Sequence, residues 1–173
     1  MDIKDYIASI PGFPKEGIIF RDITPILQEP KALHSVVSQL SDFVKEVEAD
    51  VILGPEARGF LFGVPVASTC ELGFVPVRKP GKLPRETISQ TYDLEYGQDA
   101  LCIHTDAIQP GQKVVIIDDL LATGGTVEAI IKLVHSMQAT VVGCGFVVEL
   151  DDLHGRDLFQ NIPICALTHF EGE

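Results

Sequence analysis

Residues 114–126 read V-V-I-I-D-D-L-L-A-T-G-G-T, and this stretch decides how the rest of the chain is interpreted. Its first four residues are β-branched and apolar, as in a central parallel strand buried on both faces. Asp118 and Asp119 follow where that strand is expected to end, and residues 122–126 then form a loop of small residues. From about residue 126 to 137 apolar side chains recur on one face, which predicts a helix. The order is therefore strand, loop and helix.

The 122–126 loop has the chemistry of a phosphate site. Gly124 and Gly125 let the backbone approach an anion closely. The helix that begins there adds unpaired N–H groups and a positive dipole end, and Thr123 and Thr126 add hydroxyl donors. A Gly-Gly turn alone is often only a turn, but Asp118 and Asp119 beside it would repel a phosphate unless they bind sugar hydroxyls or a metal. The combination indicates a phosphorylated sugar.

Strands and helices alternate along most of the 173 residues, which form one domain, 1–173. The pattern predicts an α/β fold with a mostly parallel twisted sheet flanked by helices on both faces. Strands are expected at 51–53, 74–77, 114–117, 140–148 and 164–167, with a further extended segment at 17–25. Helices are expected at 1–9, 30–47, 60–72 and 126–137, and residues 151–161 look irregular.

Residues 78–104 do not fit this alternation. Four of the thirteen basic residues, Arg78, Lys79, Lys82 and Arg85, fall within eight positions. A hairpin is expected after them, with its turn at 96–99. We expect this segment to project from the sheet as a flexible lid, although a solvated loop would explain the same pattern.

Composition restricts the partners. The net charge of −12 argues against a nucleic-acid or anionic-membrane partner, because both attract basic patches. No run approaches the roughly 20 apolar residues of a membrane span, and no secretory signal is evident, so a cytoplasmic protein is expected. The four cysteines are widely spaced, which favours reduced, mostly buried thiols over a metal site or disulfides.

Three loops follow three expected parallel strands, and such loops open on the same edge of a sheet. They cover residues 54–59, 78–85 and 118–125. Arg58, with Lys79 and Lys82, could therefore hold a second anion near the 122–126 loop. This layout suits a phosphorylated sugar that carries a pyrophosphate.

Residues 118–126 resemble the phosphoribosyl-pyrophosphate segment of the type I phosphoribosyltransferases. Four further segments are similar to the adenine-specific members of that family, and the match runs from about residue 11 to 149. They read F-R-D-I-T-P at 20–25, G-P-E-A-R-G-F at 54–60, V-R-K-P-G-K-L-P at 77–84 and Y-D-L-E-Y-G at 92–97. Hypoxanthine–guanine relatives carry an Asp where this chain has Ala122, which disfavours an oxo-purine substrate.

The resemblance implies Mg²⁺-dependent transfer of ribose 5-phosphate from phosphoribosyl pyrophosphate to adenine, giving AMP and pyrophosphate in purine salvage. It also implies a homodimer and a base-binding hood at residues 1–30. The implied phosphate and ribose contacts are Asp118, Asp119, Ala122, Thr123, Gly124, Gly125 and Thr126, with Mg²⁺ held mainly by substrate and by water on the two acids. Arg58, Arg78, Lys79 and Lys82 would bind pyrophosphate, and Ile19, Phe20 and Arg21 would bind adenine.

The family also implies a cis Glu56–Ala57 peptide, and catalytic roles for Arg58 and for Glu95, which would take part in proton transfer.

Two other functions are less consistent with the sequence. A non-catalytic sensor of phosphoribosyl pyrophosphate would keep the fold, but such regulators carry an added DNA-binding segment for which this acidic chain has no spare length. A dinucleotide-binding dehydrogenase is disfavoured because no G-x-G-x-x-G opens a helix after the first strand.

Overall fold

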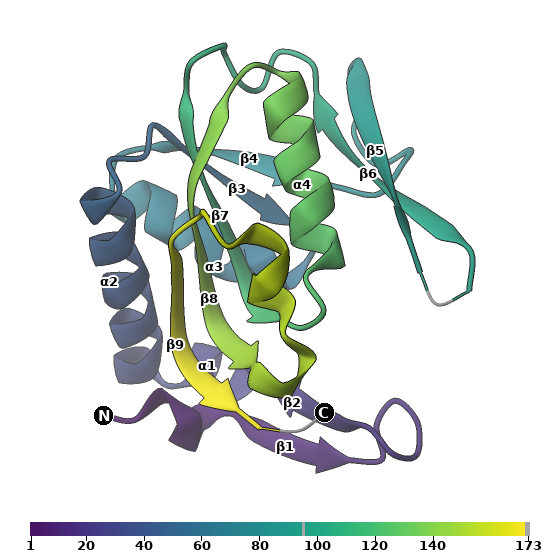
Figure 1. The fold of residues 1–173 in the computed structure, drawn as a ribbon. Coiled ribbons are helices and arrows are strands. Elements are labelled where there is room, and N and C mark those ends of the chain that lie inside the picture. The colour runs from purple at the N-terminus through teal and green to yellow at the C-terminus, as the bar shows by residue number, and fades with distance from the viewer. Residues whose placement is uncertain (95, 172–173) are drawn as a thin grey trace.

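The protein is described by a computed structural model that covers residues 1–94 and 96–171. Its centre is a five-stranded parallel sheet in the order β4-β3-β7-β8-β9 (Figure 1). The strands are β3 (Val51–Pro55), β4 (Gly73–Val77), β7 (Lys113–Leu121), β8 (Thr140–Leu150) and β9 (Ile164–Phe170). All five expected strands are present, which confirms the parallel sheet.

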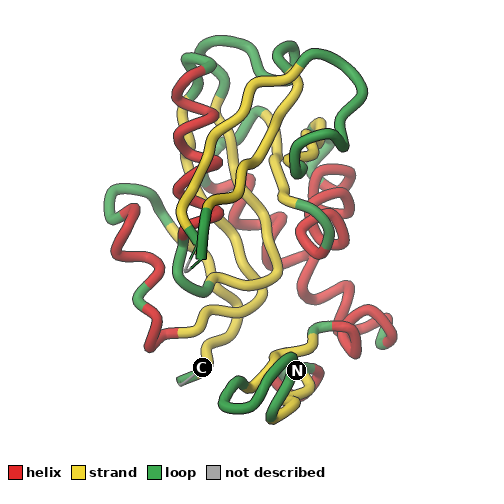
Figure 2. The backbone as a smooth tube through the Cα atoms, turned by 90° about the vertical axis from the view of Figure 1, so that its right-hand side faces the viewer, coloured by secondary structure: helices red, strands yellow, loops and turns green. Residues whose placement is uncertain are grey.

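Helices cover both faces of this sheet, as the alternation predicts (Figure 2). Helices α2 (Pro30–Glu46) and α3 (Arg58–Thr69) lie on one face, and α4 (Gly125–Ser136) lies on the other. A hydrophobic core lies on each face of the sheet, and neighbouring residues of β3 pack into different ones. Ile52 packs with α2 and α3, and Leu53 packs with α4. Because successive strand side chains point to opposite faces, this run of apolar residues buries both sides of the sheet.

Strand β7 differs from the expectation in one respect that matters for the site. The sequence predicts its end before Asp118, but it continues to Leu121, since residues 118–121 pair with residues 146–149 of β8. Its pairing with β3 ends at Ile116. Asp118 and Asp119 therefore lie within a strand whose β3 side has already opened, rather than in a loop.

The N-terminal segment is not the helix that its apolar spacing predicts. It has a 3-10 turn, η1 (Ile3–Tyr6), and then β1 (Ala8–Pro11), which pairs antiparallel with β2 (Ile19–Asp22). The backbone of 8–11 satisfies its hydrogen bonds across this hairpin, so tertiary pairing overrides the helical spacing. A short helix, α1 (Thr24–Gln28), follows. The β1–β2 hairpin lies at the same end of the molecule as the carboxyl end of β9 (Figures 1 and 2).

The second hairpin is confirmed, but its turn begins earlier than expected: the strands are β5 (Thr87–Asp93) and β6 (Gln98–His104). Leu101 and Ile103 of β6 are buried in the core on the α4 side. Only the distal part extends away from the sheet (Figure 1), so the 78–104 segment is partly core and not wholly a lid.

Smaller differences concern element ends. Helix α3 begins two residues earlier than expected and ends at Thr69, three residues before the expected end. The residue with a left-handed backbone after the helix is Glu71 (φ 57°), not Gly73. The irregular stretch after β8 contains two 3-10 turns, η2 (Asp151–Leu153) and η3 (Gly155–Phe159). All four cysteines are free; two are buried and two half-buried. Across the described residues, no helix has both the length and the hydropathy needed to cross a membrane.

Candidate active site

The 122–126 loop joins β7 to α4 at the carboxyl edge of the sheet. Gly124 is the residue before α4, and its φ of 89° is a left-handed conformation that favours glycine. Gly124 has no side chain to cap this helix, so the first N–H groups of α4 remain available to a ligand. The loop lines a cleft of about 470 Å³, together with residues 55–58, Lys79, Tyr92 and Leu101. A loop with free backbone N–H groups that face a cleft has the geometry that a bound anion requires.

Two acids, Asp118 and Asp119, line the cleft. Asp119 is buried, and its Oδ2 lies 2.7 Å from Nε of Arg58. Asp118 accepts a hydrogen bond from the backbone N–H of Asp119 at 2.8 Å. Burial raises the pKa of Asp118 well above its usual value, and repulsion from the Asp119 carboxylate adds to the rise. The nearby charge of Arg58 offsets part of this rise.

Arg58 can lie close to these acids because the next residue of helix α3 is Gly59, which has no side chain to hold the helix away from β7. A Cβ on Gly59 would lie 3.1 Å from the carbonyl oxygen of Ile117 and 3.2 Å from Oδ1 of Asp118. The start of α3 thus packs directly on β7. The Glu56–Ala57 peptide that precedes it is cis, which confirms the expectation drawn from the family.

The basic loop is ordered by acidic partners. Glu56 accepts hydrogen bonds from the backbone N–H of Lys79 at 2.8 Å and from Nε of Arg78 at 3.2 Å. The Lys79 N–H is the largest cause of the lowered pKa of Glu56, and Arg78 adds to it. The Nζ of Lys79 is held by Asp99 and by the hydroxyl of Tyr92, and its bond to Asp99 raises the pKa of Lys79.

A second cavity, of about 330 Å³, adjoins the first and is mostly apolar. Its lining comes from β2, from the end of β7 and from the residues around η2: residues 18–21, Arg58, Asp119, Leu120, Thr123, Leu150 and Leu153. The ring of Phe20 lies 5.5 Å from the Arg58 guanidinium carbon. The guanidinium of Arg21 stacks at 4.1 Å on Phe170 of β9, which fixes the hairpin to the sheet. The two cavities share Arg58, Asp119, Leu120 and Thr123.

Most of the site residues suggested by the sequence lie around these two cavities. Arg78 is turned toward Glu56, and Lys82 does not line either cavity. Glu95 lies outside the described residues. Sequence reasoning assigned no site role to Glu56, Tyr92 or Leu153. Glu56 and Tyr92 lie in the motifs at 54–60 and 92–97 and could have been noticed there, but Leu153 reaches the second cavity only through the fold.

Comparison with known proteins gives consistent matches. A family model described as phosphoribosyl transferase domain matches residues 22–163. An adenine phosphoribosyltransferase from Alkaliphilus oremlandii is 54% identical over 171 residues, covering 99% of both chains.

Solved structures agree. A crystal structure of adenine phosphoribosyltransferase from Thermoanaerobacter pseudethanolicus superposes with a TM-score of 0.93 and 52% identity, covering 97% of this chain and 98% of the other. The Saccharomyces cerevisiae enzyme, crystallised with adenine and an imino-altritol bisphosphate, gives a TM-score of 0.89 and 42% identity over 95% and 96% of the two chains.

Proposed function

The chain belongs to the adenine phosphoribosyltransferases, type I members of the phosphoribosyltransferase family, and on this premise we propose how its residues perform the reaction. The activity transfers the 5-phosphoribosyl group from phosphoribosyl pyrophosphate to adenine and yields AMP. Phosphate, ribose, pyrophosphate and base each bind a separate group of residues in the two joined cavities.

The 5-phosphate binds the 122–126 loop. Backbone N–H groups at the start of α4 and the hydroxyls of Thr123 and Thr126 donate to its oxygens, and the helix dipole favours its charge. The positive φ of Gly124 supports this assignment, because it turns the loop backbone toward the cleft.

Asp118 and Asp119 bind the ribose hydroxyls, and Arg58 and Lys79 meet the pyrophosphate, with Arg78 and Lys82 completing its surroundings. Loss of pyrophosphate leaves an oxocarbenium-like sugar, so the site must stabilise a departing anion. Both Arg58 and Lys79 line the first cleft and are positively charged.

The donor set also fits Mg²⁺ carried by the substrate. Within the described part of the chain, Arg58 is the one cation in an ion pair with these adjacent acids, through Asp119, and burial together with repulsion from Asp119 raises the pKa of Asp118. Asp118 and Asp119 would hold the ion through water, in keeping with the preference of Mg²⁺ for carboxylates and retained water. When bound, the ion neutralises the pyrophosphate oxygens.

Adenine occupies the apolar cavity. Phe20 stacks on the ring, and the backbone at Ile19 and Arg21 reads its edge. Leu120, Leu150 and Leu153 line the same cavity and supply apolar contact. The shared wall of the two cavities carries the proposal, because the anomeric carbon must lie between the pyrophosphate that leaves and the base that replaces it, and Arg58 belongs to both cavities.

Adenine must also lose a proton as its ring nitrogen bonds to the sugar. We assign this proton to Glu95, on the family resemblance alone. The basic loop at 78–85 and the distal part of the β5–β6 hairpin then act as the lid that keeps water from the reactive sugar.

The assembly is proposed to be a cytoplasmic homodimer. Helix α3 leaves Leu61 and Val64 exposed, at 41% and 49%, on the helix that also supplies Arg58. A second copy of the chain packed on this face would bury them and would fix α3 beside the site.

The test is an assay with phosphoribosyl pyrophosphate and Mg²⁺ against adenine, hypoxanthine and guanine in turn. We expect AMP from adenine, little product from the oxo-purines, loss of activity with EDTA and its return with Mg²⁺. Activity that persists in EDTA would contradict the metal assignment. Light scattering tests the dimer, and a monomeric mass would contradict it.

A further inference from the structure

The segment after β8 packs its backbone against the 122–126 loop. A Cβ on Gly124 would lie 2.8 Å from the carbonyl oxygen of Gly155 and 3.2 Å from Cδ1 of Leu158. A Cβ on Gly155 would in turn collide with the carbonyl oxygen of Ala122. Backbone thus rests on backbone at this contact, and a displacement of η3 displaces the loop with it.

An ion pair fixes η3 in this position. Glu149, near the end of β8, has a side chain only 4% exposed and lies beside Leu121 of β7 in the sheet. Arg156, the residue after Gly155, donates from Nε to Oε2 of Glu149 at 2.7 Å and from Nη2 to Oε1. The two-pronged contact fixes both distance and orientation. Removing the guanidinium would leave a buried carboxylate without its main partner.

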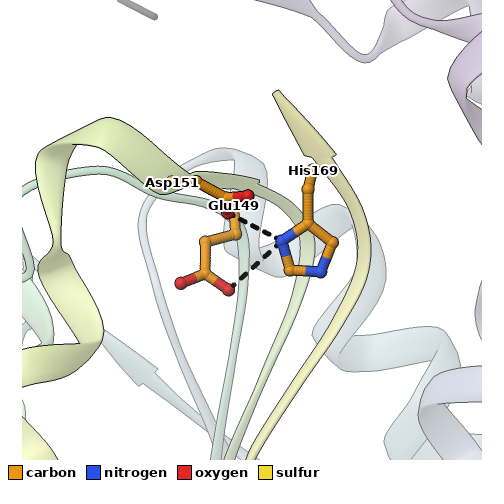
Figure 3. Close-up of side chains that lie close together, drawn as sticks. All are labelled: Glu149, Asp151 and His169. Carbon is orange, nitrogen blue, oxygen red and sulfur yellow. Dashed lines mark hydrogen bonds and ion pairs between the residues drawn. The ribbon is translucent and has the colours of Figure 1, made fainter. Parts of the chain in front are cut away.

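Figure 3 shows two further side chains, Asp151 and His169, that lie beside Glu149. The Nδ1 of His169, on β9, lies 2.7 Å from Oδ1 of Asp151 and 3.6 Å from Oε1 of Glu149. The three side chains offer ligand atoms within 4.8 Å of one another, as a metal site would. Because Arg156 takes both Glu149 oxygens, the protein itself supplies the cation, and the group is an ion-pair network.

We propose that Glu149 and Arg156 are a positioning pair for the 5-phosphate of the substrate. Neither residue lines either cavity. They act through Gly155, which holds Gly124 and Ala122 in the conformation that directs the N–H groups into the cleft. The inference rests on the phosphate assignment made above for the 122–126 loop.

The test compares Arg156→Met and Glu149→Gln with the native enzyme in steady-state kinetics, varying each substrate separately. We expect KM for phosphoribosyl pyrophosphate to rise about tenfold, because a small misplacement of a binding group is costly. KM for adenine should stay within about twofold of the native value, because the pair does not reach the base cavity. Arg156→Lys, which keeps the charge but loses the fork, should recover part of the affinity. The double variant should resemble the single ones, since the two residues act as one unit.

A purely structural role gives a different result. If the pair only stabilises the fold, its loss lowers Tm and the fraction of active enzyme, with both KM values unchanged, and this outcome would overturn the proposal. Glu149→Gln serves if Arg156→Met does not fold, because it retains shape and an acceptor. Lys132→Met is the control, since Lys132 pairs with Glu128 at 3.9 Å and both side chains are exposed.

A parallel variant separates this inference from the phosphate assignment. Thr123→Val removes a hydroxyl from the loop itself. If it leaves KM for phosphoribosyl pyrophosphate unchanged, the loop assignment is wrong. If it raises that KM and the Arg156 and Glu149 variants do not, the loop assignment stands and the positioning pair is refuted.

Discussion

The Nε of Arg58 lies 2.7 Å from Oδ2 of Asp119, and this ion pair forms part of the wall between the phosphate and base cavities. Asp119 is buried, whereas the Arg58 side chain is 49% exposed. The buried acid uses Nε, and the other N–H donors of the guanidinium remain to meet an anion. Asp119 thus orients Arg58 before the substrate arrives, so less of the cost of ordering it falls on binding.

The first prediction concerns the paired acids. Asp119→Asn combined with Asp118→Asn should lower kcat/KM by about 10²–10³, the usual loss on removing a preorganised electrostatic group. Folding should be little affected, because asparagine keeps the shape, and Tm checks this. Asp106→Asn is the control, since Asp106 pairs with Arg85 at an exposed position. Near-normal turnover in the double variant would remove the two acids from the site.

The second prediction uses two adjacent glycines. Gly124→Ala should destabilise the fold by about 1–3 kcal/mol, because alanine must adopt a left-handed φ and also meets Gly155. Gly125→Ala is the matched control: its Cβ would meet none of the described atoms within 4 Å, and its φ is not positive. Urea unfolding of both variants measures the difference. Equal stabilities would show that the Gly124–Gly155 contact is not tight.

The sequence predicted the parallel sheet, the helices on both faces and the 122–126 loop, because each depends on a local pattern. Residues 114–117 read as a buried strand whatever surrounds them, and the Gly124 turn follows from its own composition. Expectations failed where a distant partner decides the backbone. Residues 8–11 form a strand because 19–22 pair with them, and β7 continues through Asp118 because β8 continues beside it.

The site divides in the same way. Arg58, Lys79 and Asp119 could be named from their motifs and line the cleft. Gly155 and Arg156 could not, since their importance comes from packing on Gly124 and on Glu149. A sequence also does not show that Lys79 is held by Asp99, twenty residues away. Side chains whose role depends on tertiary contacts require the structure.

The third prediction concerns Glu95. Glu95→Gln should lower kcat by about 10²-fold or less, the lower range for one general acid or base, and should leave both KM values nearly unchanged. The pH–rate profile is the deciding measurement: the native enzyme should show a titration that the variant lacks. An unchanged profile would argue against proton transfer by this residue. Asp93→Asn, in the same hairpin, also removes one negative charge and controls for altered charge on the lid.

The fourth prediction concerns the base cavity. Phe20→Leu should raise KM for adenine by about three- to tenfold, and Phe20→Ala by more, because base–aromatic stacking contributes about 1–3 kcal/mol per base. KM for phosphoribosyl pyrophosphate should change little. Phe20→Leu measures mainly the loss of stacking, since leucine keeps much of the apolar area. The further rise in Phe20→Ala measures the loss of that area. If both variants changed only the pyrophosphate-substrate KM, adenine would have to bind elsewhere.

The fifth prediction concerns Glu56, which accepts hydrogen bonds from Lys79 and Arg78 of the basic loop. Its pKa is lowered in the folded protein, so the unfolded chain binds the proton more tightly. The stabilisation is therefore complete above the ordinary value of 4.5 and is lost as the pH falls through the lower, folded value.

Glu56→Gln should then cost about 1–2 kcal/mol at pH 7, as expected for a charged hydrogen bond, and the difference from the native protein should shrink below pH 4.5. Urea unfolding at pH 7, 5.5 and 4 measures it, with Glu16→Gln, an exposed acid, as the control. KM for phosphoribosyl pyrophosphate should rise as well, because the loop that carries Lys79 loses its anchor. A stability difference that is independent of pH would mean that the Glu56 charge does not hold the loop.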